Sequence, residues 1–171
     1  IDHMRPTPGP HLVWPEQSLS SPIFAIHGNT IGLAQGTEIS IFNDSGFRQA
    51  SFQTDEEVRD LQLNADGWWA LTESQLIQNG EVVGMGGHAL TFWNGEPWVR
   101  FEDAVTGPSG DVEVPHASGP ITAWGDRLLV VTENGLASVG TDYSVETVWE
   151  GTALAVTTND AGEVVILRPG G

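Results

Sequence analysis

One pattern of apolar runs and turns recurs along this chain, and it limits the possible folds more than any other feature. Residues 121–136 (ITAWGDRLLVVTENGL) align without a gap on residues 61–76 (LQLNADGWWALTESQL) after a shift of 60 positions, and on residues 90–105 (LTFWNGEPWVRFEDAV) after a shift of 31. Residues 25–42 and 155–167 keep the same order of elements, with small adjustments in their turns. The second apolar runs of the five copies contain Ile31, Trp69, Trp98, Leu129 and Val165.

Each copy is expected to form four short strands. In the best-defined copy they span residues 121–124, 128–132, 136–139 and 145–149, and turns at Gly125-Asp126 and Asn134-Gly135 separate the first three. A four-stranded antiparallel sheet cannot bury both of its faces alone, so neighbouring copies must cover one another. We therefore predict an all-β domain, a small β-propeller of about five short blades.

The two ends of the chain are expected to complete one blade between them. The last copy stops after two strands, while residues 11–14 (HLVW) form an apolar segment that resembles residues 147–150 (TVWE). If Leu12–Trp14 pairs with the last blade, formed by Ala153–Arg168, the ring closes and its exposed sheet edges disappear. We predict a ring closed by this N-terminal strand.

The repeats resemble a known superfamily. The units at 61–76 and 121–136 read Asp-Gly or Gly-Asp, apolar strand, Thr-Glu and a second turn before Leu, which is similar to the quinoprotein-like and two-component-regulator-type repeats of β-propellers. The tryptophan-docking pattern of quinoproteins and the Trp-Asp dipeptide of WD repeats are absent. The resemblance implies a fold and carries over no functional residue.

Charge excludes two classes of partner. The chain has 23 acidic and six basic residues, a formal net charge of −17, and all six basic residues are scattered arginines. Nucleic acids and anionic membranes are bound by clustered Lys and Arg, so we expect neither as a partner. No run approaches the ~20 apolar residues of a membrane helix, which argues against membrane insertion. The absence of cysteine excludes disulfides and thiolate metal sites.

The first ten residues are expected to lie outside the folded domain. We interpret residues 1–4 as a cloning remnant and residues 5–10 (RPTPGP) as a proline-rich linker, so that the propeller domain comprises residues 11–171. Such a linker predicts that the domain belongs to a longer protein.

No sequence signature of an active site is present. The chain lacks a phosphate-binding loop, a Gly-x-Ser-x-Gly elbow and a His-Glu-x-x-His motif. The segments expected to form the inner strands (IFAI, LQLN, ALTF, ITA and LAV) carry no Asp, Glu, Lys or Arg, so they offer no general acid or base. We expect no catalytic residue, no metal ligand and no cofactor. His27, His88 and His116 would make a zinc site only if the ring brought them together, and backbone hydrogen bonds are the alternative.

The candidate binding residues share one position in the repeat. Trp93 and Trp124 end inner strands just before the turns Asn94-Gly95 and Gly125-Asp126, and Asn64 and His27 fall at or beside that position in two other blades. Either the four residues form a mixed aromatic and polar binding rim, or the indoles simply fill the channel or the space between blades.

The function predicted from these features is a non-catalytic binding or scaffold module. It would be extracellular or periplasmic and would present a rim of loops to a protein or glycan partner. The alternative is a hydrolase or lyase acting on sugars or lactones, with its carboxylates on loops at Asp55, Glu56, Glu102 or Asp103. A third possibility is a structural spacer within a longer protein.

The Asp55-Glu56-Glu57 run is read either as a solvated connection or as a loose cation site.

Overall fold

The computed structural model describes residues 21–159 and 161–170, which form eighteen β-strands. None of the described segments is a helix that could cross a membrane. The predicted pairing of Leu12–Trp14 and the predicted boundary at residue 10 lie outside the described residues. The strands are β1 (Ile23–His27), β2 (Thr30–Gln35), β3 (Glu38–Asn43), β4 (Arg48–Gln53), β5 (Asp60–Asn64), β6 (Gly67–Leu71), β7 (Gln75–Gln78), β8 (Glu81–Met85), β9 (Ala89–Trp93), β10 (Glu96–Phe101), β11 (Ala104–Gly107), β12 (Gly110–Glu113), β13 (Ala117–Trp124), β14 (Arg127–Thr132), β15 (Gly135–Val139), β16 (Val145–Glu150), β17 (Ala155–Thr158) and β18 (Val164–Leu167).

The strands form four antiparallel sheets of four strands each, with the strands in chain order. We call them blade 1 (β1–β4), blade 2 (β5–β8), blade 3 (β9–β12) and blade 4 (β13–β16), and we call β17–β18 the terminal hairpin. The second strand of each unit contains the residue that the repeat alignment predicts for it. The predicted all-β class and the predicted unit of four strands are therefore confirmed.

Asn-Gly pairs close two of the hairpins. Asn94 and Gly95 have φ angles of 53° and 79°, and the flanking residues Trp93 and Glu96 pair directly. Two successive positive φ angles give the turn whose twist matches that of antiparallel strands, and Asn and Gly adopt them most readily. The sequence signal and the observed turn therefore have the same physical cause.

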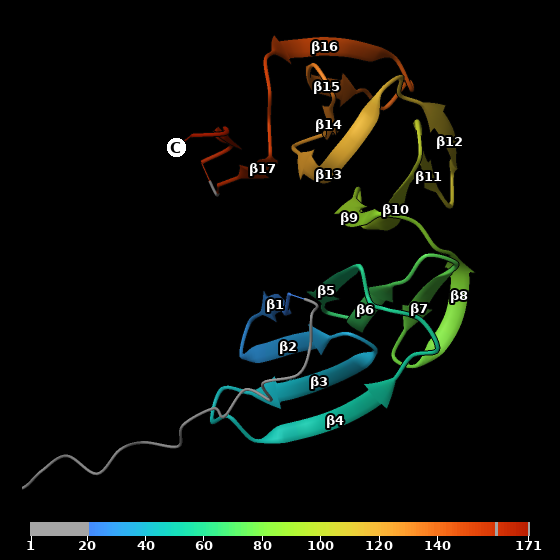
Figure 1. The fold of residues 1–171 in the computed structure, drawn as a ribbon, viewed down its shortest axis with the longest axis vertical. Helices are drawn as coiled ribbons and strands as arrows, with labels where there is room; N and C mark the ends of the chain where they lie inside the picture. The colour runs from blue at the N-terminus through green and yellow to red at the C-terminus, as the bar shows by residue number, and fades with distance from the viewer. Residues whose placement is uncertain (1–20, 160, 171) are drawn as a thin grey trace, which may run out of the picture.

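The blades follow one another along an arc (Figure 1). Their first strands are neighbours in the order β1, β5, β9, β13 and β17, while β4, β8, β12 and β16 run along the outside of the arc. In the described part of the chain the arc is open, with β1 at one end and the terminal hairpin at the other. The predicted closure of the ring by the N-terminal strand therefore stays a prediction.

The hydrophobic core consists of four clusters, one between each pair of successive units. The cluster between blades 3 and 4 is the largest, and it includes Trp93, Trp98 and Leu128. The cluster between blades 2 and 3 is smaller, with five buried members. Those five residues are Trp69, Leu71, Leu76, Leu90 and Val99.

One expectation about the inner strands is wrong. Strand β5 begins at Asp60, one residue before the segment LQLN, so an inner strand does carry a carboxylate. Asp60 lies where blades 2 and 3 meet, and its oxygens accept hydrogen bonds from the backbone N–H groups of Leu61 and Leu90, each at 2.8 Å. The carboxylate thus joins two successive inner strands.

Candidate functional site

The two ends of the inner strands form two different surfaces. We call the turns β1–β2, β5–β6, β9–β10 and β13–β14 the hairpin rim, and the segments that lead into the inner strands (54–59, 86–88, 114–116 and 151–154) the connection rim. The four predicted binding residues end β1, β5, β9 and β13, so they belong to the hairpin rim. They are His27, Asn64, Trp93 and Trp124.

Two of these residues lie in one pocket. His27 and Asn64 line a cavity of about 280 Å³ between blades 1 and 2, together with Leu63 and Trp68. The His27 side chain is exposed to solvent. Asn64 is held in place, because its Oδ1 accepts hydrogen bonds from the backbone N–H of Asp66 at 2.9 Å and from another indole, Trp69 Nε1, at 3.2 Å. The pocket therefore combines an apolar wall with an accessible imidazole.

The two tryptophans lie elsewhere. Trp93 is only 2% exposed and meets Trp98 edge to face, with ring centroids 5.0 Å apart. Trp124 packs against the cluster between blade 4 and the terminal hairpin, and its Nε1 donates to the carbonyl of Gly162 at 2.7 Å. These contacts favour the interpretation that the indoles fill the space between blades, and the binding role of all four residues stays a prediction.

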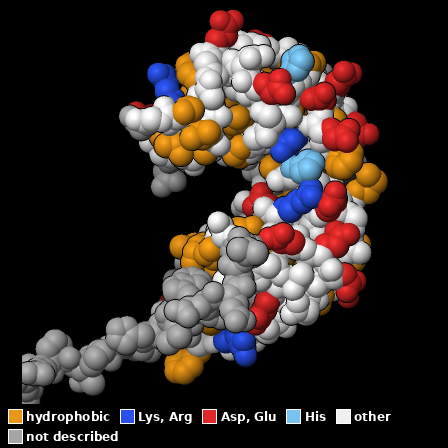
Figure 2. Space-filling model, in the orientation of Figure 1, with side chains coloured by type: hydrophobic (Ala, Val, Ile, Leu, Met, Phe, Trp, Pro, Cys, Tyr) orange, Lys and Arg blue, Asp and Glu red, His pale blue; other side chains and the backbone are white. Residues whose placement is uncertain are grey.

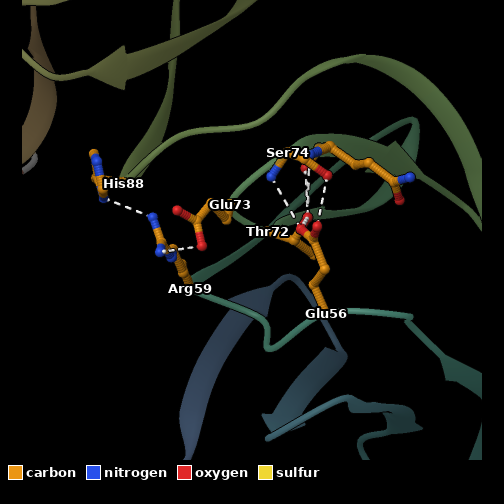
Figure 3. Close-up of polar contacts among 7 residues, drawn as sticks. Glu56, Arg59, Thr72, Glu73, Ser74 and His88 are labelled. Carbon is orange, nitrogen blue, oxygen red and sulfur yellow. Dashed lines mark hydrogen bonds and ion pairs between the residues drawn. The ribbon is translucent and has the colours of Figure 1, made fainter.

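A network of polar contacts fixes the connection rim (Figure 3). The Glu56 carboxylate accepts hydrogen bonds from Thr72 Oγ1 at 2.8 Å, from the Ser74 N–H at 3.0 Å and from Ser74 Oγ at 2.8 Å. The hydrogen bonds from Ser74 and Thr72 lower the pKa of Glu56 below its ordinary value. Glu56 therefore ties the connection after blade 1 to the β6–β7 turn of blade 2.

A second group of the same network contains an arginine and a histidine. Arg59 forms an ion pair with Glu73 at 3.0 Å and contacts Nδ1 of His88 at 2.8 Å. Because a guanidinium group can only donate, Nδ1 accepts this bond and the proton of the neutral ring is on Nε2. Burial, and after it the charges of Arg100 and Arg59, lower the pKa of His88. The imidazole also stacks on Phe101, with centroids 6.1 Å apart.

A cationic or imidazole side chain precedes the inner strand in three successive blades. Arg59, His88 and His116 occupy this position, and His116 lies 3.7 Å from Glu133 much as Arg59 lies beside Glu73. The sequence analysis considered the three histidines together as possible zinc ligands and did not align His88 and His116 with Arg59. The available signal was their common position immediately before each inner strand.

The three histidines do not lie together. His27 lies on the hairpin rim, whereas His88 and His116 lie on the connection rim. Within residues 21–159 and 161–170, no three His, Cys, Asp or Glu side chains are grouped so that they could hold a metal ion. Glu56 has a lowered pKa, which disfavours it as a general acid. Glu102 lies in the β10–β11 turn with a φ angle of 48°.

Comparison with known proteins identifies the fold. No protein-family model and no curated protein sequence matches the chain. The extracellular domain of the putative one-component system BT4673 from B. thetaiotaomicron matches with a TM-score of 0.67 at 16% identity, over 90% of this chain and 27% of that one. BamB from Moraxella catarrhalis matches with a TM-score of 0.60 at 11% identity, over 84% of this chain and 54% of that one. The WD40 domain of Neurospora crassa Pan2 matches with a TM-score of 0.60 at 10% identity, over 86% of this chain and 59% of that one.

These similarities bear on the fold alone, because the sequence identities are low. The chain spans between 27% and 59% of the lengths of these three proteins. The chain has a propeller-type fold, as its repeats predict.

Proposed function

We propose that the chain is a non-catalytic binding or scaffold module that presents its hairpin rim to a protein or glycan partner. The observation that carries this proposal is the pocket of about 280 Å³ shared by His27 and Asn64. The two residues end successive inner strands, so the repeat itself places them side by side. A site built on strand ends of a packed scaffold is well suited to rigid recognition.

The chemistry of the pocket supports the same two classes of partner. Leu63 and Trp68 supply apolar surface, while the imidazole of His27 can donate or accept a hydrogen bond. Sugars and peptide side chains present apolar and hydrogen-bonding groups together, and such mixed pockets recognise them. The inner-strand carboxylate of Asp60 is already engaged by backbone donors, which makes it a poor partner for a substrate.

An extracellular or periplasmic setting within a longer protein is part of the proposal. The BT4673 structure is described as an extracellular domain, and this chain corresponds to 27% of it. The net charge of −17 favours solubility in any aqueous compartment, so it does not distinguish one setting from another.

The substitution His27→Ala tests the rim. We expect it to weaken binding of a glycan or peptide found by array screening by about tenfold, because it removes the exposed polar group of the pocket. His116→Ala, on the opposite rim, is the matched control and should change the dissociation constant less than twofold. Titration calorimetry with the purified chain and the array hit gives both values.

Two outcomes would contradict the proposal. One is a dissociation constant that responds equally to His27→Ala and His116→Ala, which would move binding away from the pocket. The other is turnover of glycans or lactones that Glu102→Gln abolishes, which would favour the hydrolase or lyase.

We also propose that the N-terminal segment closes a ring of about five blades. The terminal hairpin has two strands where the other units have four, and Val165 and Leu167 on β18 are more than half exposed. A third strand supplied by Leu12–Trp14 would cover this edge. Deletion of residues 1–15 is therefore expected to increase self-association, measured by sedimentation velocity. A truncated chain that stays monomeric with an unchanged melting temperature would argue against closure.

A further inference from the structure

An apolar groove lies on the outer side of the arc, between blades 2 and 3. Its volume is about 520 Å³, and its base is formed by Trp69, Leu76 and Val99, all members of the small core cluster between these blades. Figure 2 shows hydrophobic side chains at the surface on this side of the arc. The exposed apolar residues at the mouth of the groove are Val83, Met85 and Phe101.

The groove exists because one side chain is missing from the repeat. In each blade, the strand register pairs one residue of the outer strand with an apolar residue near the start of the third strand, and these positions are equivalent in the four blades. Blades 1, 3 and 4 have Phe52, Val112 and Trp149 at this position, and each packs against the core cluster that follows its blade. Blade 2 has Gly84. The pairs are Ile39–Phe52, Leu76–Gly84, Val105–Val112 and Leu136–Trp149.

The backbone does not require glycine at this position. Gly84 has no left-handed φ angle, and a Cβ built on it would meet Leu76 Cδ2 at 3.6 Å, an ordinary van der Waals contact. A larger side chain could therefore occupy the groove, as it does in the other three blades. The absence of a side chain at Gly84 leaves apolar surface that another molecule can cover.

The edge of β8 next to the groove carries little charge. Strand β8 is the outer strand of blade 2 and pairs only with β7, so its other edge is unpaired in the described part of the chain. Its only charged residue is Glu81, at its first position, just as Arg48 is the only charged residue of β4. The other two outer strands carry two charges each, which protect an edge from pairing: Asp111 and Glu113 on β12, and Glu146 and Glu150 on β16.

The charges around the groove favour a basic partner. Glu102 and Asp103 lie between the two lining residues Phe101 and Ala104, and Glu81 lies at the far end of β8. Arg100 lies beside this acidic end, because its Nη1 donates to the carbonyl of Glu102 at 3.4 Å. It is 8% exposed and its Nε donates to the carbonyl of Gly119 at 2.7 Å, so Glu102 and Asp103 are the exposed members of this group. The groove is thus apolar along its length and acidic at its ends.

We propose that this groove binds an extended peptide that is apolar in its centre and carries lysine or arginine at both ends. The peptide would add to β8 as a further strand and would place a large apolar side chain in the space that Gly84 leaves empty. Its basic ends would face Glu81 at one end and Glu102 and Asp103 at the other. The proposal rests on the proposed function as a binding module, but it uses a surface remote from His27.

The test uses three nine-residue peptides with the same alternating phenylalanine and threonine centre. The first has two lysines at each end, the second has two glutamates at each end, and the third has the lysines and a central proline. Fluorescence polarisation with the full chain should show binding of the first peptide, at least tenfold weaker binding of the second, and none of the third. The proline removes a backbone donor, and the glutamates reverse the charge.

Three variants locate the site. Gly84→Phe places in blade 2 the side chain that blade 1 has at Phe52, and it should abolish peptide binding while the melting temperature stays the same or rises. Met85→Lys should weaken binding at least tenfold. Phe47→Lys is the matched control, since Phe47 is 71% exposed and Met85 is 74% exposed, and it should have no effect.

Several results would overturn the inference. Peptide binding that survives in Gly84→Phe would do so, as would equal losses in Met85→Lys and Phe47→Lys. Binding of phosphatidylcholine vesicles without peptide binding would assign the groove to a lipid surface, and self-association lost in Gly84→Phe would assign it to a second copy of this chain. If the groove fails these tests while His27→Ala still weakens binding at the hairpin rim, only the peptide inference is lost.

Discussion

The substitution Trp93→Ala is expected to lower the free energy of unfolding by about 3–5 kcal/mol, the range for truncating a buried aromatic side chain. Trp93 is 2% exposed and belongs to the cluster between blades 3 and 4, where it meets Trp98 edge to face. Its removal would leave a cavity between two blades that the remaining sheets cannot fill without moving. Urea denaturation followed by circular dichroism measures the loss.

The substitution Trp93→Phe separates packing from hydrogen bonding. The indole Nε1 of Trp93 is buried without a hydrogen-bond partner within the described residues, so phenylalanine sacrifices no bond and removes a buried polar group that has no partner there. The cost of Trp93→Phe should therefore be well below that of Trp93→Ala. If Trp93→Ala instead melts like the unchanged chain but loses a ligand, the indole acts in binding and not in packing.

The strands could be predicted from the sequence because the apolar runs of the repeat have the same spacing as the strands. Ile31, Trp69, Trp98, Leu129 and Val165 mark the second strand of each unit both in the alignment and in the structure. Turn residues such as Asn94 and Gly95 set the hairpins through their backbone preferences, which are local and readable. The predicted unit of four strands follows from these two signals.

The contacts between blades could not be predicted in the same way. The contact of Arg59 with His88 depends on how blades 2 and 3 pack, and no local pattern encodes that packing. The groove beside Gly84 could not be predicted either, because it follows from the strand register, which pairs Gly84 with Leu76. The predicted inner strand began at Leu61, one residue later than β5 does, and so it left out Asp60.

The substitution Asp60→Ala is expected to lower the free energy of unfolding by about 2–5 kcal/mol, since it leaves two backbone N–H groups at the junction of blades 2 and 3 without their acceptor. These groups belong to Leu61 and Leu90, and each donates to the carboxylate at 2.8 Å. The link between β5 and β9 should weaken as a result. Asp126→Ala, at an exposed turn, is a suitable control and should cost little.

The cost of Asp60→Ala should also depend on pH. Burial raises the pKa of Asp60 above its ordinary value of 3.8, against the opposing effect of the N–H donors of Leu90 and Leu61. The folded state therefore holds the proton more tightly than the unfolded state, so this stabilising contribution is complete below the unfolded pKa and is lost as the pH rises through the folded pKa. Denaturation of both chains at pH 4 and pH 7 should give a larger difference at pH 4, and comparison at each pH cancels the contributions of distant groups. A difference that grows toward pH 7 would mean that the N–H donors outweigh burial and that Asp60 is ionised in the folded protein at mildly acidic pH.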